Sequence, residues 1–273
     1  MLTALSRWKF VLSLVPLAGV AASEPQEART GSYELVWEDE FDRDGLPDPA
    51  KWIWDTHANK TGWYNKELQY YAADRSENAR VEKGRLIITA RKETLSDRAD
   101  HGGQKYTSAR LITKGKAEWT YGMIEVRAKL PCGKGSWPAI WTLGSTASHP
   151  DGGEIDIMEH VGMTPGDVFG TVHTRASVGT SGNGAKVVVA DACEAFHDYQ
   201  LVWTPKELRF AVDGKAYHKY VNEGTGVAQW PFDKPQYLLL NLAVGGAMGG
   251  AVDDAIFPAT FEIEHVRVYQ RKP

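Results

Sequence analysis

The sequence predicts an all-β protein, a sandwich of antiparallel β-sheets, and three observations support that class. Short runs of alternating apolar and polar residues recur along the chain, and a period of two is typical of strands with one buried face. Asp-Gly and Gly-Gly pairs occur between such runs, and the 27 glycines and 13 prolines suit many tight turns. No long stretch keeps a helical period, so strands must supply the core.

Five runs show the alternation most clearly, and each predicts one strand. They are residues 85–90, 122–129, 199–203, 208–214 and 264–269. In the run 122–129, Ile124 and Val126 alternate with Glu125 and Arg127, so one face would be apolar and the other charged. The run 208–214 ends in Asp-Gly, a pair that predicts a turn at that point.

The first 22 residues have the pattern of a secretory signal peptide, and residues 23–32 form a short flexible leader. Arg7 and Lys9 make a basic start, and an apolar run extends from Phe10 to Ala22. The run is too short to span a membrane and contains Pro16. We therefore expect an exported protein, either secreted or periplasmic, in which residues 33–273 form a single β-sandwich domain.

Charge and cysteine content exclude several function classes. Removing the two basic residues of the signal changes the formal net charge from −4 to −6, and no basic cluster is present. This argues against nucleic acid and an anionic membrane as partners and favours a neutral substrate. Cys132 and Cys193 are too few for a disulfide scaffold, and they either pair in an oxidising compartment or stay free. Nothing indicates a stable oligomer, so a monomer is expected.

The segment Gly153–His160 carries three carboxylates and is the main functional signal. Glu154 and Asp156 alternate with two isoleucines, so a strand would place both acids on one face. Strict alternation would point Glu159 the other way, whereas one extra residue, a β-bulge, would turn it back beside the other two. Crowded carboxylates repel one another, which raises at least one pKa and keeps one group protonated near neutral pH. A protonated acid beside an ionised carboxylate is what glycoside cleavage requires.

Aromatic residues gather in clusters that suit a carbohydrate groove. The clusters are Trp52–Trp54, Trp63–Tyr64 and Trp137–Trp141. Flat rings stack on the apolar faces of sugars, while acids and amides bind the hydroxyl groups. The alternative for a single tryptophan is core packing, which we expect for Trp37 and Trp203. Trp137, beside Gly135 and Pro138, suits exposure in a groove at least as well.

Further segments strengthen the carbohydrate interpretation when they are taken together and in order. They are Trp37–Phe41, Asn65–Tyr71, Tyr106–Leu111, Trp137–Trp141, the acid motif, Gly170–Thr174, Phe196–Pro205, Asn241–Gly246 and Val266–Tyr269. In this order they resemble glycoside hydrolase family 16, and within it the laminarinase-type endo-β-1,3-glucanases. The resemblance implies a concanavalin-like (lectin-like) jelly roll of two bent antiparallel sheets. The bulged form of the acid motif, with Met158 inserted, is similar to the laminarinase branch.

The resemblance also assigns roles to the three acids. Glu154 would be the nucleophile of a double displacement, and Glu159 would be the general acid/base. Asp156 would hydrogen-bond the nucleophile and tune its ionisation. Such a retaining mechanism requires the two glutamate carboxyl groups to lie roughly 5–5.5 Å apart.

The resemblance further implies a set of substrate-binding residues and no cofactor for the chemistry. They are Trp137 and Trp141 as an aromatic wall, Asn65, Arg110 and Asn241 as partners of glucosyl hydroxyls, and His173 near the acid/base. For His173 the alternative is a satisfied core histidine. Two departures concern substrate binding: His149 stands where the family often has tryptophan, and Lys66 stands where asparagine is common. A stacking platform at His149 would be missing or replaced.

Many family members also bind a structural calcium ion on the convex side, far from the acids. Here its ligands would be the Glu40 region, the backbone of Gly84 and the side chain of Glu264. The family more often has aspartate at the position of Glu264. Calcium accepts oxygen ligands in varied geometry, so a glutamate could serve.

The function expected from these residues is endo-acting, retaining hydrolysis of β-1,3-glucosidic bonds in laminarin-like β-glucans, with mixed-linkage β-1,3-1,4-glucan as a second candidate substrate. A non-catalytic β-glucan-binding recognition protein would be expected to lose a catalytic glutamate, and both are present. A hydrolase of sulfated galactans would need cationic partners for sulfate, which this chain lacks near the acid motif. Transglycosylation stays open, because water and a second sugar compete for the same intermediate.

Overall fold

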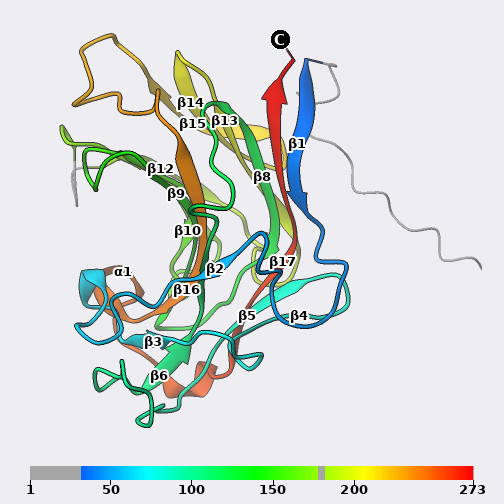
Figure 1. Ribbon diagram of the computed structural model, residues 1–273, viewed down its shortest axis with the longest axis vertical. Helices are drawn as coiled ribbons and strands as arrows, with labels where there is room; N and C mark the ends of the chain where they lie inside the picture. The colour runs from blue at the N-terminus through cyan, green and yellow to red at the C-terminus, as the bar shows by residue number, and fades with distance from the viewer. Residues whose placement is uncertain (1–31, 178–181, 273) are drawn as a thin grey trace, which may run out of the picture.

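The computed structural model describes residues 32–177 and 182–272, so the expected signal peptide and residues 23–31 of the leader lie outside the described residues. Two large antiparallel sheets face each other and supply nearly all of the regular structure (Figure 1). We call them the outer sheet, on the right of Figure 1, and the inner sheet, which curves along its left. This arrangement confirms the predicted jelly-roll sandwich.

The outer sheet has eight strands in the order β15-β14-β13-β8-β17-β5-β4, with β1 also paired to β17. The strands are β1 (Tyr33–Asp39), β4 (Ala79–Val81), β5 (Leu86–Ala90), β8 (Gly122–Lys129), β13 (His197–Trp203), β14 (Glu207–Val212), β15 (Lys215–Val221) and β17 (Ala259–Arg271). All five alternating runs of the sequence form strands of this sheet. The run 122–129 and β8 share the same bounds.

The inner sheet has seven strands in the order β12-β11-β10-β9-β16-β7-β2. The strands are β2 (Ile53–Trp54), β7 (Arg110–Ile112), β9 (Ser136–Gly144), β10 (Glu154–His160), β11 (Asp167–His173), β12 (Asn183–Val188) and β16 (Gln236–Val244). Every residue of β16 is buried. Leu238 and Leu240 pack in the main core, while Leu239 packs in a second apolar cluster with Ile112 and Tyr237. Burial on both faces explains why β16 shows no alternation in the sequence.

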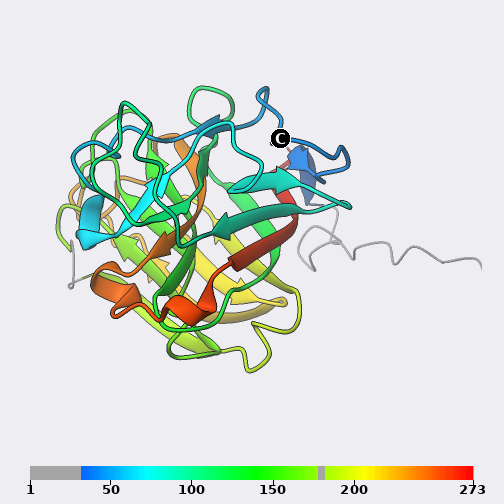
Figure 2. The ribbon, with the colours of Figure 1, turned by 90° about the horizontal axis from the view of Figure 1, so that it is seen from below.

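Short segments close one end of the sandwich. They are a parallel pair of strands, β3 (Gln69–Tyr71) and β6 (Tyr106–Ser108), and single turns η2 (Tyr64–Lys66), α1 (Gly246–Gly249) and η4 (Asp254–Ile256). Figure 2 views this end from below, with η2 in cyan and α1 and η4 in orange to red. Among the described residues α1 is the only α-helix, which confirms that strands supply the core.

The main core fills the space between the two sheets. Trp203 is 1% exposed within it, and Trp37 packs against it, as expected for both. Behind β10 the sheets approach so closely that Gly170 of β11 has no room for a side chain. A Cβ there would lie 2.8 Å from Phe210 Cδ1 and would also clash with the Tyr217 hydroxyl. Glycine at this position therefore allows the outer-sheet rings to pack behind the acid motif.

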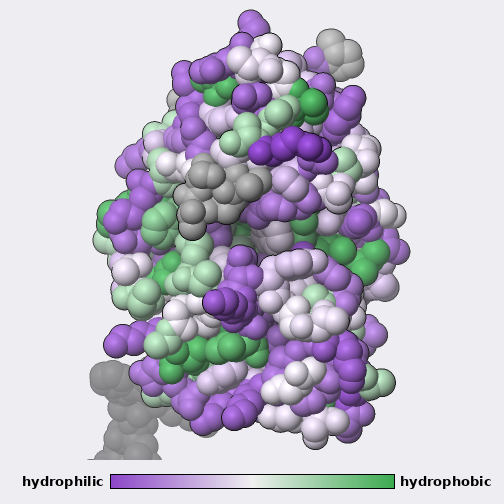
Figure 3. All heavy atoms as spheres, turned by 90° about the vertical axis from the view of Figure 1, so that its left-hand side faces the viewer, coloured by the Kyte–Doolittle hydropathy of each residue, from purple (hydrophilic) through white to green (hydrophobic). Residues whose placement is uncertain are grey.

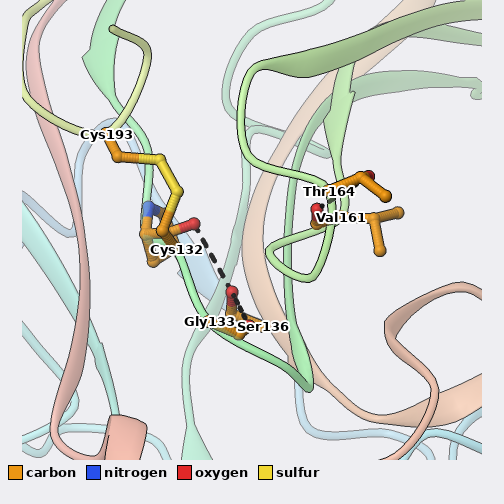
Figure 4. Close-up of a disulfide and its surroundings, with 7 residues drawn as sticks. Cys132, Gly133, Ser136, Val161, Thr164 and Cys193 are labelled. Carbon is orange, nitrogen blue, oxygen red and sulfur yellow. Dashed lines mark hydrogen bonds between the residues drawn. A yellow bond between two sulfur atoms is a disulfide. The ribbon is translucent and has the colours of Figure 1, made fainter. Parts of the chain in front are cut away.

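Cys132 and Cys193 form a disulfide, which resolves the pairing that the sequence left open (Figure 4). Their Cα atoms are 5.9 Å apart, and the bond joins the segment after β8 to the segment before β13. Beside it, Ser136 Oγ at the start of β9 donates a hydrogen bond to the Gly133 carbonyl at 3.0 Å. The disulfide thus lies next to the loop that leads into the strand of Trp137 and Trp141.

No helix among residues 32–177 and 182–272 has the length and apolar character needed to cross a membrane.

Candidate active site

The acid motif forms β10, which lies between β9 and β11 in the inner sheet. Pairing is regular up to Asp156, which lies opposite Trp141 of β9. Ile157 then has no partner on β9, and pairing resumes with Met158 opposite Ile140. The predicted β-bulge is therefore present, and on the β9 side the residue that is passed over is Ile157 rather than Met158.

The bulge determines which face of the inner sheet each side chain of β10 points to. Ile155, Ile157 and Met158 all pack in the core between the sheets. Glu154 and Glu159 lie on the other face, close enough that the charge of Glu154 acts on Glu159. One extra residue therefore changes which face receives Glu159, because the side-chain period of a strand is two.

Burial and neighbouring charges raise the pKa of two of the three acids. Burial raises the pKa of Asp156 well above its usual range, and the neighbouring charges of Glu154 and Glu159 raise it further. Burial also raises the pKa of Glu159 to about 7, and the negative charges of Glu154 and Glu67 act in the same direction. Asp156 also has a side-chain hydrogen bond with Glu154, as the resemblance implied. A protonated Glu159 can donate a proton, and a protonated Asp156 can donate a hydrogen bond.

Trp137 holds the acid/base candidate in place. Its Nε1 donates a hydrogen bond to Glu159 Oε1 at 3.0 Å, and its side chain comes from β9, the neighbouring strand. This bond lowers the pKa of Glu159 and so opposes the effect of burial. Trp137 is only 6% exposed. It therefore contacts the acid directly and offers little open stacking surface.

Trp141 begins a series of side-chain hydrogen bonds that continues through Asn241 and Tyr71 to Glu67. Its Nε1 donates to Asn241 Oδ1 at 2.7 Å, and Asn241 Nδ2 donates to the Tyr71 hydroxyl at 3.0 Å. The Tyr71 hydroxyl in turn donates to Glu67 Oε2 at 3.4 Å. Burial raises the pKa of Glu67, which also lies near enough to Glu159 to affect its pKa. The series thus links the aromatic wall to a fourth carboxyl group beside the acid/base.

Arg110 lies between two tryptophan rings. Its guanidinium is 5.0 Å from the Trp63 ring centroid and 4.8 Å from that of Trp141. Its Nε is 2.9 Å from Asp55 Oδ2, and His57 Nδ1 is 2.6 Å from the other oxygen of Asp55. Arg110 is therefore held by neighbours on three sides, and it supports Trp141 in addition to lining the groove.

His173 of β11 lies at the nucleophile end of the motif. It is paired across the strands with Glu154, and its Nε2 is 3.2 Å from Asp156 Oδ2. Its direct contact is therefore with Asp156, and the expectation that it lies close to the acid/base stays a prediction. Burial lowers the pKa of His173, which favours the neutral imidazole.

His149 also contacts the nucleophile candidate. Its Nε2 is 2.9 Å from Glu154 Oε2, and the hydrogen bond with Glu154 raises the pKa of His149. His149 comes from the loop 145–153 that joins β9 to β10. That loop ends at Gly153, which has φ +73° and where a Cβ would lie 2.6 Å from Phe232 Cε1. A residue with a side chain would disturb the entry into β10.

A cavity of about 770 Å³ lies over the inner sheet; of the three acids Glu154 lines it, whereas Asp156 and Glu159 are not among its lining residues. Its lining comprises Asp55, His57, Tyr64, Asn65, Arg110, Ile112, Lys114, Trp141, Leu143, Ser148, His149, Glu154, His173 and Tyr237. Figure 3 shows the molecule from this side, with hydrophilic and hydrophobic side chains mixed around a hollow near the middle of the face. Four of the six residues expected to bind substrate line the cavity, whereas Trp137 and Asn241 lie beneath it.

A family model described as glycosyl hydrolases family 16 matches residues 63–263. The chain belongs to this family. It is 47% identical over 279 aligned residues to a beta-glucanase of Rhodothermus marinus, which covers 97% of this chain and 94% of the relative. It is 37% identical to a glucan endo-1,3-beta-glucosidase of Cryptopygus antarcticus, which covers 87% of this chain and 92% of the relative.

Solved structures of the family have the same fold. The structure of SCLam, a non-specific endo-beta-1,3(4)-glucanase of family 16, matches with a TM-score of 0.87 and 52% identity. The match covers 88% of this chain and 92% of that one.

The calcium ligands implied by the family do not fit a cation in this chain. Glu40 makes a bidentate pair with Arg267, with distances of 2.6 and 2.8 Å to its two oxygens. Glu264 Oε2 is 2.8 Å from Arg127 Nε, and Arg85 is 3.6 Å from its other oxygen. Both carboxylates are thus neutralised by guanidinium groups, and a metal ion would have to displace them.

Sequence reasoning missed several residues of the site. Glu67 and Tyr71 belong to a segment that carried the family resemblance, but no role was assigned to either. Tyr64 is 65% exposed and lines the cavity, and Tyr237 lines it from β16. The clustering of Trp63 and Tyr64 was a signal for the first of these, whereas nothing local to Glu67 indicates that it lies near Glu159.

Proposed function

We propose that this family 16 hydrolase is an endo-acting, retaining β-1,3-glucanase of laminarin-like glucans. The observation that carries the proposal is the bulge in β10, which gathers Glu154, Asp156 and Glu159 on one face beneath an aromatic-lined groove. The reaction needs no cofactor, because the carboxyl groups supply both the nucleophile and the proton.

In the first step Glu159 gives its proton to the glycosidic oxygen. An oxygen of Glu154 attacks the anomeric carbon, the bond between that carbon and the leaving oxygen breaks, and a covalent glycosyl-enzyme forms. The pKa of Glu159, raised to about 7 chiefly by burial, keeps the acid protonated below that pH. Asp156, with its pKa raised by burial, can donate its proton in a hydrogen bond to the nucleophile.

In the second step the ionised Glu159 removes a proton from water. The water oxygen bonds to the anomeric carbon, and the bond to Glu154 breaks, which restores both acids to their starting states. Two inversions at the same carbon retain its β configuration. A sugar hydroxyl in place of water would give transglycosylation by the same step.

The groove supports a neutral, extended glucan as substrate. Trp141 and Tyr64 offer rings for stacking, and Asn65 offers an amide beside them. The relatives are a beta-glucanase and a glucan endo-1,3-beta-glucosidase, and SCLam is a non-specific endo-beta-1,3(4)-glucanase. We therefore propose β-1,3-glucan as the main substrate and mixed-linkage β-1,3-1,4-glucan as a second one.

Export and a monomeric state are separate parts of the proposal, which includes no structural calcium ion. The disulfide supports export to an oxidising compartment, and N-terminal sequencing of the mature protein tests cleavage after residue 22. Gel filtration with light scattering tests the monomer. The ion pairs of Glu40 and Glu264 predict that calcium and a chelator leave the melting temperature unchanged.

The function is tested by sugar release from purified mature protein on laminarin, curdlan, lichenan, carboxymethyl cellulose and agarose. We expect rapid formation of oligosaccharides from laminarin, slower release from lichenan, and little from cellulose or agarose. Binding of laminarin without turnover would favour a recognition protein. Cleavage of agarose alone would show that the substrate class is wrong.

A further inference from the structure

His149 contacts the catalytic centre through the nucleophile itself. Its Nε2 is 2.9 Å from Glu154 Oε2, at hydrogen-bond distance. Among the described residues it is the only Lys, Arg or His side chain that forms an ion pair with Glu154. The Glu154 side chain is 19% exposed and that of His149 is 44% exposed, so the pair lies at the wall of the groove and is partly shielded from water.

The loop that carries His149 is fixed at both ends. Ser145 N donates to the Pro235 carbonyl at 3.0 Å, and Gly152 N donates to the Ser148 carbonyl at 3.0 Å. Gln236 Nε2, in the buried strand β16, donates to the Gly152 carbonyl at 2.8 Å. A side chain on such an anchored loop has a defined position, so its contact with Glu154 follows from the fold.

The charged groups around His149 come from several elements. On β10 it faces Glu154, and on β11 it faces His173, whose pKa is lowered partly by the charge of His149. On its own loop, Asp151 forms an ion pair with Arg175. Across the cavity are Lys114 and the group formed by Arg110, Asp55 and His57. Among residues 32–177 and 182–272, Glu154 is the group in direct polar contact with His149.

We propose that His149 is a positioning residue for the nucleophile: it donates a hydrogen bond from Nε2 to Glu154 Oε2 and fixes the orientation of the carboxylate. The inference rests on the proposed retaining function. The hydrogen bond with Glu154 also raises the pKa of His149, so its imidazolium form persists to higher pH than in a free histidine.

The role of His149 is most visible in kcat. A carboxylate that loses its fixed orientation attacks the anomeric carbon more slowly, while the rest of the groove still binds the glucan.

The test compares kcat and KM on laminarin for the wild type, His149→Gln and His149→Phe. Glutamine keeps a hydrogen-bond donor near the position of Nε2, whereas phenylalanine keeps a ring but has no donor. We expect kcat to fall roughly tenfold in His149→Phe and less than threefold in His149→Gln, with KM nearly unchanged in both variants.

A matched control is His101→Gln, which changes a partly buried histidine outside the groove that contacts the Gln104 carbonyl. It should leave kcat and KM unchanged. Circular dichroism melts of all variants show whether each one is folded. A wild-type kcat in both His149 variants, an equal loss in both, or a change confined to KM would show that the hydrogen bond does not position the nucleophile, and would overturn the inference.

Failure of this inference is distinguishable from failure of the proposed function. A wild-type enzyme that does not cleave laminarin would contradict the function before any variant is compared. A wild-type enzyme that cleaves laminarin, together with His149 variants that keep its kcat, would contradict the positioning role alone.

Discussion

Two glutamates on opposite faces of the molecule, Glu40 on the convex side and Glu159 on the concave side, have opposite electrostatic environments. Glu40 pairs with Arg267, and on the same side of the outer sheet Glu262 pairs with Lys129. Burial raises the pKa of Glu40, but the hydrogen bond and charge of Arg267 outweigh it, and the net pKa is lowered. Among the described residues, Glu159 has the indole N–H of Trp137 as its hydrogen-bond partner, and burial raises its pKa to about 7.

The difference shows where the fold buries a carboxyl group without a compensating cation, which makes its ionisation unfavourable. A carboxyl group paired with arginine stays ionised and contributes to stability, but it cannot donate a proton near neutral pH. A buried carboxyl group without a cation disfavours its own charge and can act as an acid. The same residue type therefore serves structure on one face and chemistry on the other, and the partner residue decides which.

The largest expected effect comes from removing the nucleophile. Glu154→Ala should reduce turnover of laminarin by roughly 10⁴-fold or more, since no covalent intermediate can form. Added azide should restore turnover and give the α-glycosyl azide, because the small anion attacks from the vacated side. Cleavage at the wild-type rate in this variant would remove Glu154 as nucleophile.

Removing the acid/base should have a substrate-dependent effect. Glu159→Ala should slow laminarin cleavage by about 10²- to 10⁴-fold, the usual contribution of a general acid. Aryl glycosides with good leaving groups need little protonation, so their first step should be nearly spared. Kinetics on both substrate types provide the check, and an equal loss on both would argue against the acid role.

A smaller effect is expected from replacing Trp137, the hydrogen-bond partner of Glu159. Trp137→Phe removes the hydrogen bond that lowers the pKa of Glu159, so this pKa should rise further. Activity requires the protonated acid and is lost as pH rises through its pKa. The basic limb of kcat should therefore move upward by roughly one pH unit. A downward shift or no shift would mean that the contact does not tune Glu159.

Breaking the Glu40–Arg267 ion pair on the convex side should lower stability and leave activity intact. Glu40→Gln leaves Arg267 without its carboxylate and should cost about 1 kcal/mol, or a melting temperature lower by about 2–4 °C. Because the pKa of Glu40 is lowered in the folded state, its contribution is present above the unfolded-state pKa and is lost as pH falls. The melting temperatures of wild type and variant should therefore converge as the pH falls toward about 3, while both proteins turn over laminarin at the same rate.

The same contrast explains how much of the structure could be predicted from the sequence. The five strands predicted from the clearest alternating runs all lie in the outer sheet, where a core face alternates with a charged face, and the strand predicted for the acid motif lies in the inner sheet. The inner strand β16 is buried throughout and gives no alternating signal. The three acids and the bulge could be predicted because they are local to eight residues, Gly153–His160.

The supporting contacts could not be predicted, because they join residues far apart in the chain. Asn241 donates to Tyr71, 170 positions away, and Arg267 pairs with Glu40, 227 positions away. The calcium ligands were expected from resemblance, but the pairing with arginine depends on strand register. His149 was recognised only as a departure from tryptophan, and its contact with Glu154 emerged from the anchored loop.

The most direct test of the retaining mechanism is the anomeric configuration of the first product. Proton NMR of laminarin during the first minutes of hydrolysis distinguishes the two anomers before they interconvert. The bulged acid pair predicts that the β-anomer appears first and that the α-anomer grows in later by mutarotation. Initial release of the α-anomer would show inversion and would contradict the roles assigned to Glu154 and Glu159.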